Sequence, residues 1–359
     1  MKKWLRANLF RNWFDGLVTV ALVSLLGWAA LAVFEWAVVN AVWDADSQLQ
    51  CYQIIRERQG NGESGACWAA FKGRSLQFVF GFYPEELYWR PTLAVSLLPF
   101  ALLPIFVRSL CQYLIWFTVC YPIIAYVLIF GALGLEEVPI SKMGGFMLVL
   151  MLGVASSGIA VAVGILLALG QTFGILPAQM VIKAIVAVFD RIPVVILLYV
   201  VLVLLNYMLP LGFIIDSFPR LLLVLGLVCA APISKKLGNH LVAILAENIE
   251  AATSLGFSRA KAYWIIVFPA AFARALPNIM DELAEMFRHI AIVSMLGFAN
   301  PLLLVNNIRA DVSWNGVYLE LFIPVAIVFW IMSFSLTSYG SYLKRRIEWR
   351  STRLMEEYN

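Results

Sequence analysis

Long stretches of this chain carry no charged residue, and they constrain its fold more strongly than any other feature. They lie at residues 16–34, 109–135, 143–182, 192–215, 289–308 and 321–343. A helix of about 20 apolar residues crosses the hydrocarbon core of a bilayer, where only helices and closed barrels satisfy their own backbone. Charged residues make up 13% of the 359 residues, against about a quarter in soluble domains. The sequence therefore predicts an all-α polytopic membrane protein.

The apolar pattern predicts about eight transmembrane helices. They are expected at residues 15–39, 92–108, 112–133, 144–170, 180–208, 217–234, 287–305 and 319–343. The sixth of these ranges is uncharged only over 221–234. Arg220 or Lys235 is therefore expected to extend its charged end to the membrane surface.

The positions of the 26 Lys and Arg residues predict how these helices are oriented. Cytoplasmic segments are enriched in Lys and Arg, and most of these residues share one side when the N-terminus is placed inside. Both termini and the tract 236–270 are then cytoplasmic, and residues 40–90 form a long outside loop. The net charge of +4 fits this orientation and requires no nucleic-acid partner. Residues 1–14 are either flanking positive charge or an interfacial helix.

The outside loop holds two of the five cysteines, Cys51 and Cys67. A disulfide can form between them if the loop lies in an oxidising periplasm; the alternative is two free thiols. The loop sequence GNGESG, residues 60–65, formally matches a dinucleotide-binding pattern. No strand is expected before it and it faces away from the cytoplasm, so we do not interpret it as a nucleotide site.

The tract EAATSLGFSRAKAYWIIVFPAA, residues 250–271, predicts two helices with a break between them. Residues 236–254 have helical apolar spacing, and Gly256 suits the left-handed position that follows a helix. Ser258 is a candidate N-cap for a second helix over 259–268, which Pro269 either ends or follows. The small residues Ala251 and Ala252 would let a partner approach closely. The alternative is an interfacial helical hairpin with no partner.

This tract resembles the EAA loop of ABC importer permeases. The matching pattern is Glu250-Ala251-Ala252, three residues, Gly256, nine residues, Ile266, one residue and then Phe268-Pro269, where the family usually has leucine at the position of Phe268. Residues 144–170 and 275–297 are similar to the corresponding segments of permeases for polar amino acids. Residues 65–68 (GACW) and 88–91 (YWRP) resemble the larger permeases of general L-amino acid importers.

The resemblance implies a type I ABC importer permease core, formed by spans 4–8, with three extra N-terminal spans. The implied organisation is a cytoplasmic interfacial segment at 1–14, spans 1–3 with the periplasmic loop at 15–143, a permease core at 144–345 that carries the coupling loop 236–270, and a cytoplasmic tail at 346–359. Residues implied to contact the ATPase are Glu250, Ala251, Ala252, Gly256 and Pro269.

The same resemblance implies the partners and the location. They are a cytoplasmic ABC ATPase dimer, a second permease subunit that is a different chain, a periplasmic amino-acid-binding protein and the bacterial inner membrane. The chain has no G-x-x-x-x-G-K-[ST] sequence, so ATP and Mg²⁺ are expected on the ATPase and no cofactor on this chain. The implied activity is transport of L-amino acids, driven by ATPase closure, and the chain itself is not expected to be an enzyme.

Charged residues in or near the apolar stretches are candidates for the substrate path or a gate, because such groups are costly in a membrane. The candidates are Asp190, Arg191, Asp281, Glu282, Glu285 and Arg288. The alternatives are anchoring of a span at the interface and an ordinary helical pair between Glu285 and Arg288. Asp190-Arg191-Ile192-Pro193 stands where the family usually has Arg-Gly-x-Pro. This departure suggests that the subunit is the non-binding half of a pair.

Two other classes of protein are alternatives to a permease. An ion-coupled secondary transporter of small polar solutes remains the alternative function, although no internal repeat is evident and the tract at 236–270 would have no role. A membrane enzyme is disfavoured, since the chain has two histidines and lacks H-E-x-x-H and G-x-S-x-G sequences. No metal-binding pattern is present in the sequence.

Overall fold

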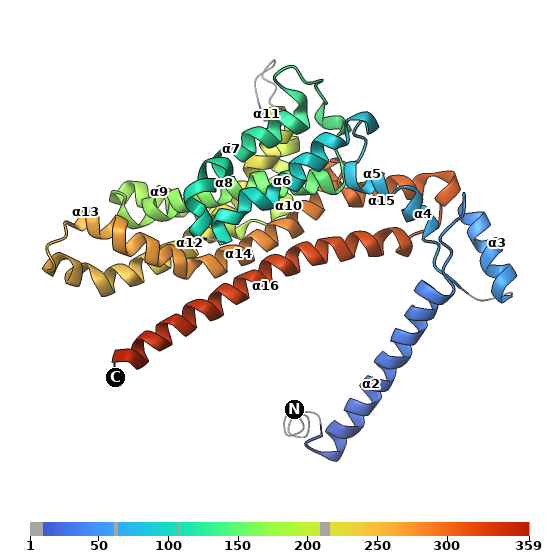
Figure 1. Cartoon of the computed structure of the whole chain (residues 1–359), viewed down its shortest axis with the longest axis horizontal. Helices are drawn as coiled ribbons and strands as arrows, with labels where there is room; N and C mark the ends of the chain where they lie inside the picture. The colour runs from blue at the N-terminus through green and yellow to red at the C-terminus, as the bar shows by residue number, and fades with distance from the viewer. Residues whose placement is uncertain (1–9, 61–63, 107, 209–215, 359) are drawn as a thin grey trace. The chain divides into compact units, whose positions relative to one another are not determined.

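The computed structural model describes residues 10–60, 64–106, 108–208 and 216–358, and these residues form helices without a named strand (Figure 1). Residues 1–9 of the expected interfacial segment lie outside this description. The α-helices are α2 Trp13–Phe34, α3 Gln48–Gln59, α4 Ala69–Gly73, α5 Ser75–Phe80, α6 Trp89–Phe106, α7 Arg108–Tyr126, α8 Gly145–Phe173, α9 Leu176–Arg191, α10 Val194–Tyr199, α11 Leu205–Met208, α12 Ser217–Ser254, α13 Arg259–Ala262, α14 Phe268–Ile292, α15 Pro301–Ala310 and α16 Leu319–Tyr358.

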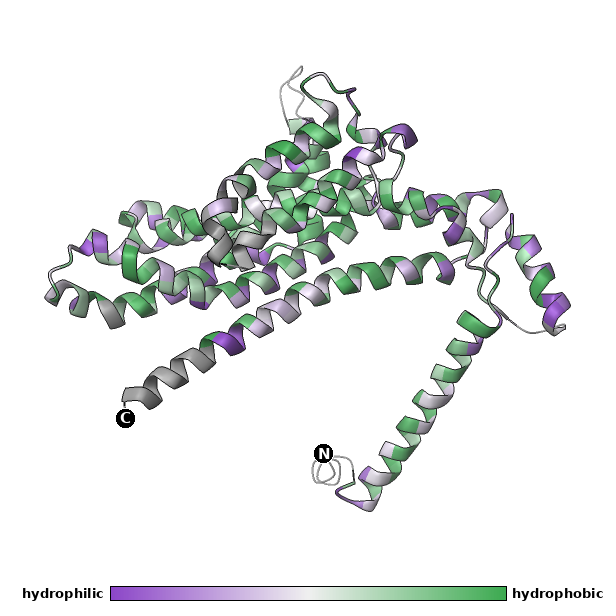
Figure 2. Ribbon diagram, viewed as in Figure 1, coloured by the Kyte–Doolittle hydropathy of each residue, from purple (hydrophilic) through white to green (hydrophobic). Residues whose placement is uncertain are grey.

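Several of these helices have the length and composition to cross a membrane, and Figure 2 shows that they consist mostly of hydrophobic residues. Five candidate spans occur among the described residues, or six if the bent pair of 176–191 and 194–208 forms one. The polytopic helical class is therefore confirmed. Helices α6 and α7 lie where the second and third spans were expected, but they are not among these candidates. The count of about eight spans stays a prediction.

The chain separates into two compact units. The first contains residues 1–75 and 305–324, and the second contains 76–304 and 325–359. The expected boundary at 143/144 stays a prediction, and α6 and α7 belong to the same compact unit as α8. Contacts at the start of α8 connect it with the segment before α6: Gly81 bridges to Met143, and a Cβ added to Gly81 would lie 2.3 Å from the Gly144 Cα.

In the first unit, polar contacts and a covalent link hold residues 40–75 together. A disulfide joins Cys51 of α3 to Cys67, with their Cα atoms 6.0 Å apart. The Cys67 backbone N–H donates to Glu320 Oε1 (3.1 Å), and Arg74 Nη2 donates to Asp311 Oδ2 (2.6 Å). Segments on either side of the second unit in sequence therefore meet within the first. Helix α2 buries none of its residues.

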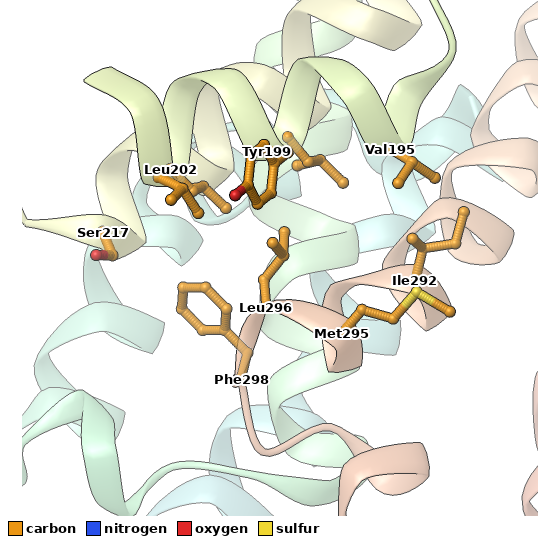
Figure 3. Close-up of a pocket in the computed structure, with 10 residues that line it drawn as sticks. Val195, Tyr199, Leu202, Ser217, Ile292, Met295, Leu296 and Phe298 are labelled. Carbon is orange, nitrogen blue, oxygen red and sulfur yellow. The ribbon is translucent and has the colours of Figure 1, made fainter. Parts of the chain in front are cut away.

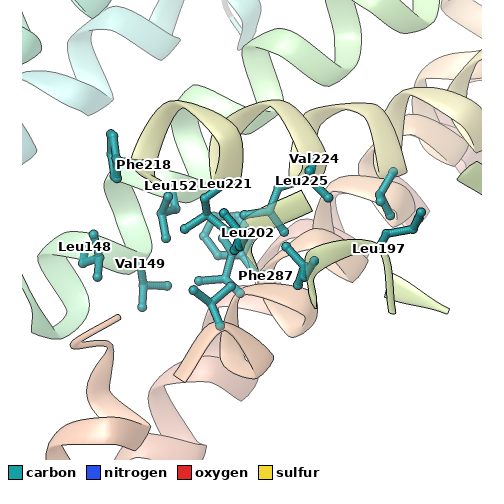
Figure 4. Close-up of a cluster of buried hydrophobic side chains, with 14 residues drawn as sticks. Leu148, Val149, Leu152, Leu197, Leu202, Phe218, Leu221, Val224, Leu225 and Phe287 are labelled. Atoms are coloured by element: carbon teal, nitrogen blue, oxygen red, sulfur yellow. The ribbon is translucent and has the colours of Figure 1, made fainter. Parts of the chain in front are cut away.

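In the second unit, α8 and α12 form the most extensively packed pair of helices. Figure 4 shows side chains from α8, α12 and α14, among them Leu152, Leu221 and Phe287, gathered around Leu202. Glycines permit the close approach of the two helices. A Cβ added to Gly226 of α12 would lie 2.5 Å from Ile159 Cγ2, and one added to Gly164 of α8 would lie 2.7 Å from Ile233 Cγ2.

The expected fifth span, 180–208, is not one straight helix. Helix α9 ends at Arg191, and the run Val194–Met208 starts after a bend of 105°. Pro193 lacks a backbone N–H and disfavours a helical conformation in the residue before it. Ile192 is accordingly extended, with φ −83° and ψ 129°. The bend places Asp190 and Arg191 at a helix end rather than within a continuous span.

Two further spans also differ from expectation. The expected sixth span, 217–234, is only the first part of α12, which continues unbroken through Pro232 to Ser254. The expected seventh span, 287–305, contains the end of α14, a break with Gly297 at φ 86°, and the start of α15. Buried Asn300 stabilises this break, because its Nδ2 donates to the carbonyls of Ile290 (3.0 Å) and Ala291 (3.2 Å).

Candidate coupling and gate site

The break between α12 and α13 is a complete Schellman motif. The Phe257 backbone N–H donates to the Ala252 carbonyl (3.1 Å), and the Gly256 N–H donates to the Thr253 carbonyl (3.0 Å). These are the two hydrogen bonds that define the motif, and they require a left-handed residue at the central position. Gly256 has φ +86°. The prediction of a left-handed glycine immediately after this helix is confirmed.

The helix that follows this break begins as the sequence predicts. The Ser258 side chain accepts a hydrogen bond from the Lys261 backbone N–H (3.4 Å) and caps α13. Helix α13 passes through a π-helical turn, Tyr263–Val267, directly into α14. Pro269 lies within this continuous run, just after the π-helical turn. The second helix therefore continues into α14 and does not end near Pro269.

The surface of the elbow, defined here as residues 250–258, is largely exposed. Glu250 and Ala251 are exposed, and so is Leu255, at 78%. Ala252, in contrast, is buried at 3%, where α12 packs with α13 and the π-helical turn. Ala252 is therefore not at the surface in this structure, and its expected contact with a partner stays a prediction. Its small side chain serves the approach of the two arms, since a larger one would separate them.

Two consecutive residues of α12 form ion pairs with two other helices, α9 and α14. Lys235 Nζ pairs with Asp190 Oδ2 of α9, and Lys236 Nζ pairs with Glu282 Oε1 of α14. Successive residues of a helix point about 100° apart, so the two lysines reach different helices. We call these two pairs the gate clamp. Ser234 lies beside it, is fully buried, and accepts a hydrogen bond from Gln171 Nε2 (3.3 Å).

The remaining candidate charges are arranged differently. Arg288 pairs with Glu285 three residues earlier on α14, an ordinary helical pair. Asp281 is exposed on the same helix. Arg191 is exposed at the end of α9, and it forms no ion pair in the part of the chain that the structure describes. The structure thus brings Asp190 and Glu282 together with α12, and leaves Arg191 and Asp281 at the surface.

Arg220 is an important residue whose role the sequence alone did not reveal. Arg220 or Lys235 was expected to extend toward the membrane surface, but Arg220 is only 5% exposed. Its Nη1 donates to the Val201 carbonyl (3.1 Å) and to Asn206 Oδ1 (2.7 Å). Val201 lies in the π-helical turn Val200–Leu204, and Asn206 lies in α11, which follows that turn. A charge inside an apolar stretch was the available signal, but several of its acceptors are backbone carbonyls that no residue type identifies.

A pocket of about 360 Å³ lies between the run 194–208 and the segment that follows α14. Figure 3 shows Met295, Leu296 and Phe298 across from Tyr199 and Leu202. The hydroxyls of Tyr199 and Ser217 are the main side-chain polar groups on a mostly apolar wall. No group of three or more His, Cys, Asp or Glu residues is placed to hold a metal ion among the residues described.

Two known permeases are similar in sequence to this chain over nearly its whole length. The chain is 30% identical to the glutamate/glutamine/aspartate/asparagine transport system permease protein BztC of Rhodobacter capsulatus, over 96% of this chain and 93% of that protein. It is 29% identical to the inner membrane amino-acid ABC transporter permease protein YhdY of Escherichia coli K12, over 96% and 92% of the two chains. No family model matches the chain.

A solved structure supports the same assignment. It is of an amino acid ABC transporter with histidines, it is 25% identical, and it superposes with a TM-score of 0.50 over 56% of this chain and 91% of that one. The fold and the comparisons together identify the chain as a permease component of a membrane transporter. The chain belongs to the permeases of amino-acid ABC transporters, and its fold is that of an ABC importer permease. It is a transport subunit rather than an enzyme.

Proposed function

We propose that this chain couples an ATPase to the import of L-amino acids through the elbow at residues 250–258. In this proposal an ATPase dimer docks on Glu250, Ala251 and the exposed apolar residues beside Gly256. Closure of the dimer on ATP then moves the elbow, and the transmembrane helices alternate between two access states. ATP and Mg²⁺ are bound by the ATPase, and this chain carries no cofactor.

The single observation that carries the proposal is the continuity of the elbow with two core helices. Helix α12 is one 38-residue helix from Ser217 to Ser254, about 57 Å long at 1.5 Å per residue. The other arm passes through a π-helical turn into α14. A force on the Schellman motif would therefore reach the buried core without crossing a flexible loop.

The gate clamp would act about halfway along this lever. Asp190 and Glu282 tie α9 and α14 to α12, so a tilt of α12 would strain both pairs at once. We propose that these pairs, with Arg191, Asp281, Glu285 and Arg288 nearby, form the cytoplasmic gate of the path. Partly exposed ion pairs contribute little stability, about 0–1 kcal/mol each, which is suitable for contacts that must break and re-form.

The remaining partners follow from the same proposal. The Lys and Arg distribution supports an orientation with both termini and the elbow in the cytoplasm of a bacterial inner membrane. A periplasmic amino-acid-binding protein would deliver the substrate, and a second permease subunit, a different chain, would complete the path. The Cys51–Cys67 disulfide supports placing the first unit's loop in an oxidising compartment.

The test is substitution of the left-handed glycine. Proline is fixed near φ −65° and cannot adopt the φ of +86° at position 256, so Gly256→Pro should abolish the motif. We expect the membrane protein still to insert, but to lose co-purifying ATPase and transport. Gly256→Asn is the matched control, because asparagine tolerates a left-handed backbone. The Gly256→Asn variant should retain both the co-purifying ATPase and transport.

A second pair of variants tests the contact surface without changing the backbone. Ala251→Trp adds a large side chain at an exposed position of the elbow, and Ala243→Trp adds the same side chain at an exposed position two turns earlier on α12. We expect only Ala251→Trp to reduce ATPase binding, by about tenfold or more, a loss of about 1.4 kcal/mol or more. Undiminished ATPase binding by both Gly256→Pro and Ala251→Trp would exclude docking at the elbow.

A further inference from the structure

A second cavity, of about 440 Å³, lies apart from the gate clamp and the elbow. Its walls are α6, the end of α7 with the following π-helical turn, α8 and the start of α12. None of the residues that line it is charged, and the hydroxyl of Tyr121 already donates to the Ala94 carbonyl (2.9 Å). An amino acid carries both an ammonium and a carboxylate, so this cavity does not suit the transported substrate.

The residues that α8 contributes form a regular helical stripe. They are Met147, Leu150, Met151, Val154, Ala155, Gly158 and Ile159. From Met147 to Ile159 the helix rises about 18 Å, a little more than half the ~30 Å hydrocarbon core of a bilayer. The cavity therefore follows α8 over the depth of a single leaflet. Ala155 and Gly158 are exposed along it, so it opens sideways.

The dimensions of the cavity restrict what can occupy it. Protein interiors contain few voids larger than a water molecule, and water does not stably fill a cavity with apolar walls. Among the components of a bilayer, a single acyl chain is thin enough to enter.

One end of the cavity continues into a smaller pocket of different chemistry. Tyr126 and Phe130 line both spaces. The smaller pocket, about 360 Å³, is also lined by the turn at Gly131 and Ala132 and by Glu137. Glu137 is exposed, and no cationic side chain pairs with its carboxylate among the described residues. An amine would complement this charge, whereas a head group with only anionic groups would be repelled.

We propose that the cavity binds one acyl chain of an aminophospholipid, and that the amine of its head group lies beside Glu137. The lipid fills the space between the α6–α7 pair and the α8–α12 pair, beside the apolar cluster that contains Ala94, Ile129 and Met147. It is a structural ligand of the permease, independent of the coupling function proposed for the elbow. Phosphatidylethanolamine satisfies both parts of the site, whereas phosphatidylglycerol satisfies only the apolar part.

The experiment measures lipid that stays bound to the purified full-length permease, in the assembly in which it purifies. The protein is reconstituted in equal amounts of phosphatidylethanolamine and phosphatidylglycerol, returned to detergent, and analysed by native mass spectrometry. We expect about one phosphatidylethanolamine per copy. Gly158→Leu should reduce it about tenfold or more, because the added side chain takes the space of several methylenes. A Cβ at Gly158 meets no atom within 4 Å, so the fold should tolerate the change.

Matched controls separate site binding from general lipid adhesion. Gly27→Leu makes the same substitution on α2, also with no atom within 4 Å, and should retain the lipid. Ala155→Leu is a second filling variant and should lose it. Glu137→Gln should abolish the preference for phosphatidylethanolamine, whereas Glu86→Gln, at another exposed carboxylate, should keep it. No retained lipid in the wild type, equal loss in Gly27→Leu, or an unchanged preference in Glu137→Gln would each overturn the proposal.

Discussion

Helices α2 and α8 are almost equally apolar, yet they differ in the contacts that each makes within its own compact unit. The most apolar window of α8 is 39% buried, whereas that of α2 is 0% buried. Helix α12 is less apolar than either, and its window is 67% buried. Hydropathy thus predicts which segments enter the membrane, but it does not rank them by burial inside the protein.

Small residues lie at the close contacts that α8 and α12 make. Lipid tails are as apolar as leucine, so helices associate in a membrane through close van der Waals contact rather than through the hydrophobic effect. Gly153, Gly164 and Gly226 each lie so close to a neighbouring side chain that an added Cβ would come within 3 Å of it. A Cβ added to Gly27 of α2 would meet no atom within 4 Å.

The first unit, which contains α2, is stabilised by other means. The Cys51–Cys67 disulfide closes a short loop, and the Trp68 indole N–H donates to the Ala37 carbonyl (2.7 Å) at the end of the α2 region. Arg74 and Asp311 add an ion pair between segments far apart in sequence. One region is thus held by packing of apolar helices, and the other by covalent and polar contacts.

The largest expected effect comes from filling a glycine contact in the packed region. Gly226→Leu would place a Cβ 2.9 Å from the Ile159 Cβ, an atom fixed to the backbone of α8. The two helices would have to separate, so we expect a loss of about 3 kcal/mol or more in unfolding free energy. The measurement is the thermal or denaturant unfolding of the detergent-solubilised protein.

Gly27→Leu is the matched variant in α2. It should leave the unfolding free energy unchanged or raise it by up to about 1 kcal/mol, because leucine is the better helix former. Equal destabilisation by Gly226→Leu and Gly27→Leu would contradict the contrast between the two helices.

An intermediate effect is expected from removal of the disulfide. The double variant Cys51→Ala/Cys67→Ala opens a loop with a sequence separation of 16, and the loss of chain constraint should cost about 2–3 kcal/mol. We expect earlier protease cleavage within residues 40–75, with no change in the unfolding of the packed helices, since distant sites act independently. Cys120→Ala, at an exposed free cysteine, is the control.

The smallest expected effect is a pH dependence confined to the first unit. The pKa of Asp311 is lowered, chiefly by the hydrogen bond from the Ser313 backbone N–H and also by the Arg74 guanidinium. A carboxyl with a lowered pKa stabilises the folded state above its unfolded pKa, about 3.9. This stabilisation is lost as the pH falls through the folded pKa, so the window lies below about pH 4.

Hydrogen exchange of residues 312–316, corrected for intrinsic rates, should therefore accelerate below about pH 4 in the wild type. Asp311→Asn should exchange faster already at neutral pH and show no such transition. The packed helices should show the same exchange in both proteins. A transition that persists in Asp311→Asn would assign the pH dependence to another group.

The elbow was the most predictable part of the molecule. Gly256 and Ser258 have the conformation and the capping role that the sequence indicated, because both depend on hydrogen bonds among residues within a turn or two of each other. The bend at Ile192–Pro193 was missed, although the proline that causes it is visible in the sequence. The apolar pattern ran through it and favoured a continuous span.

What the sequence determined by itself was the membrane class, the main helices and the elbow, since hydropathy and local backbone geometry depend on consecutive residues. Only the tertiary structure decided that Lys235 and Lys236 pair with two different helices, that Arg220 is buried on backbone carbonyls, and that Ala252 faces inward. Asp190 and Lys235 are 45 residues apart. Their meeting depends on how α9 and α12 are rotated against each other, which is set by the fit of small and large side chains across the helix interface.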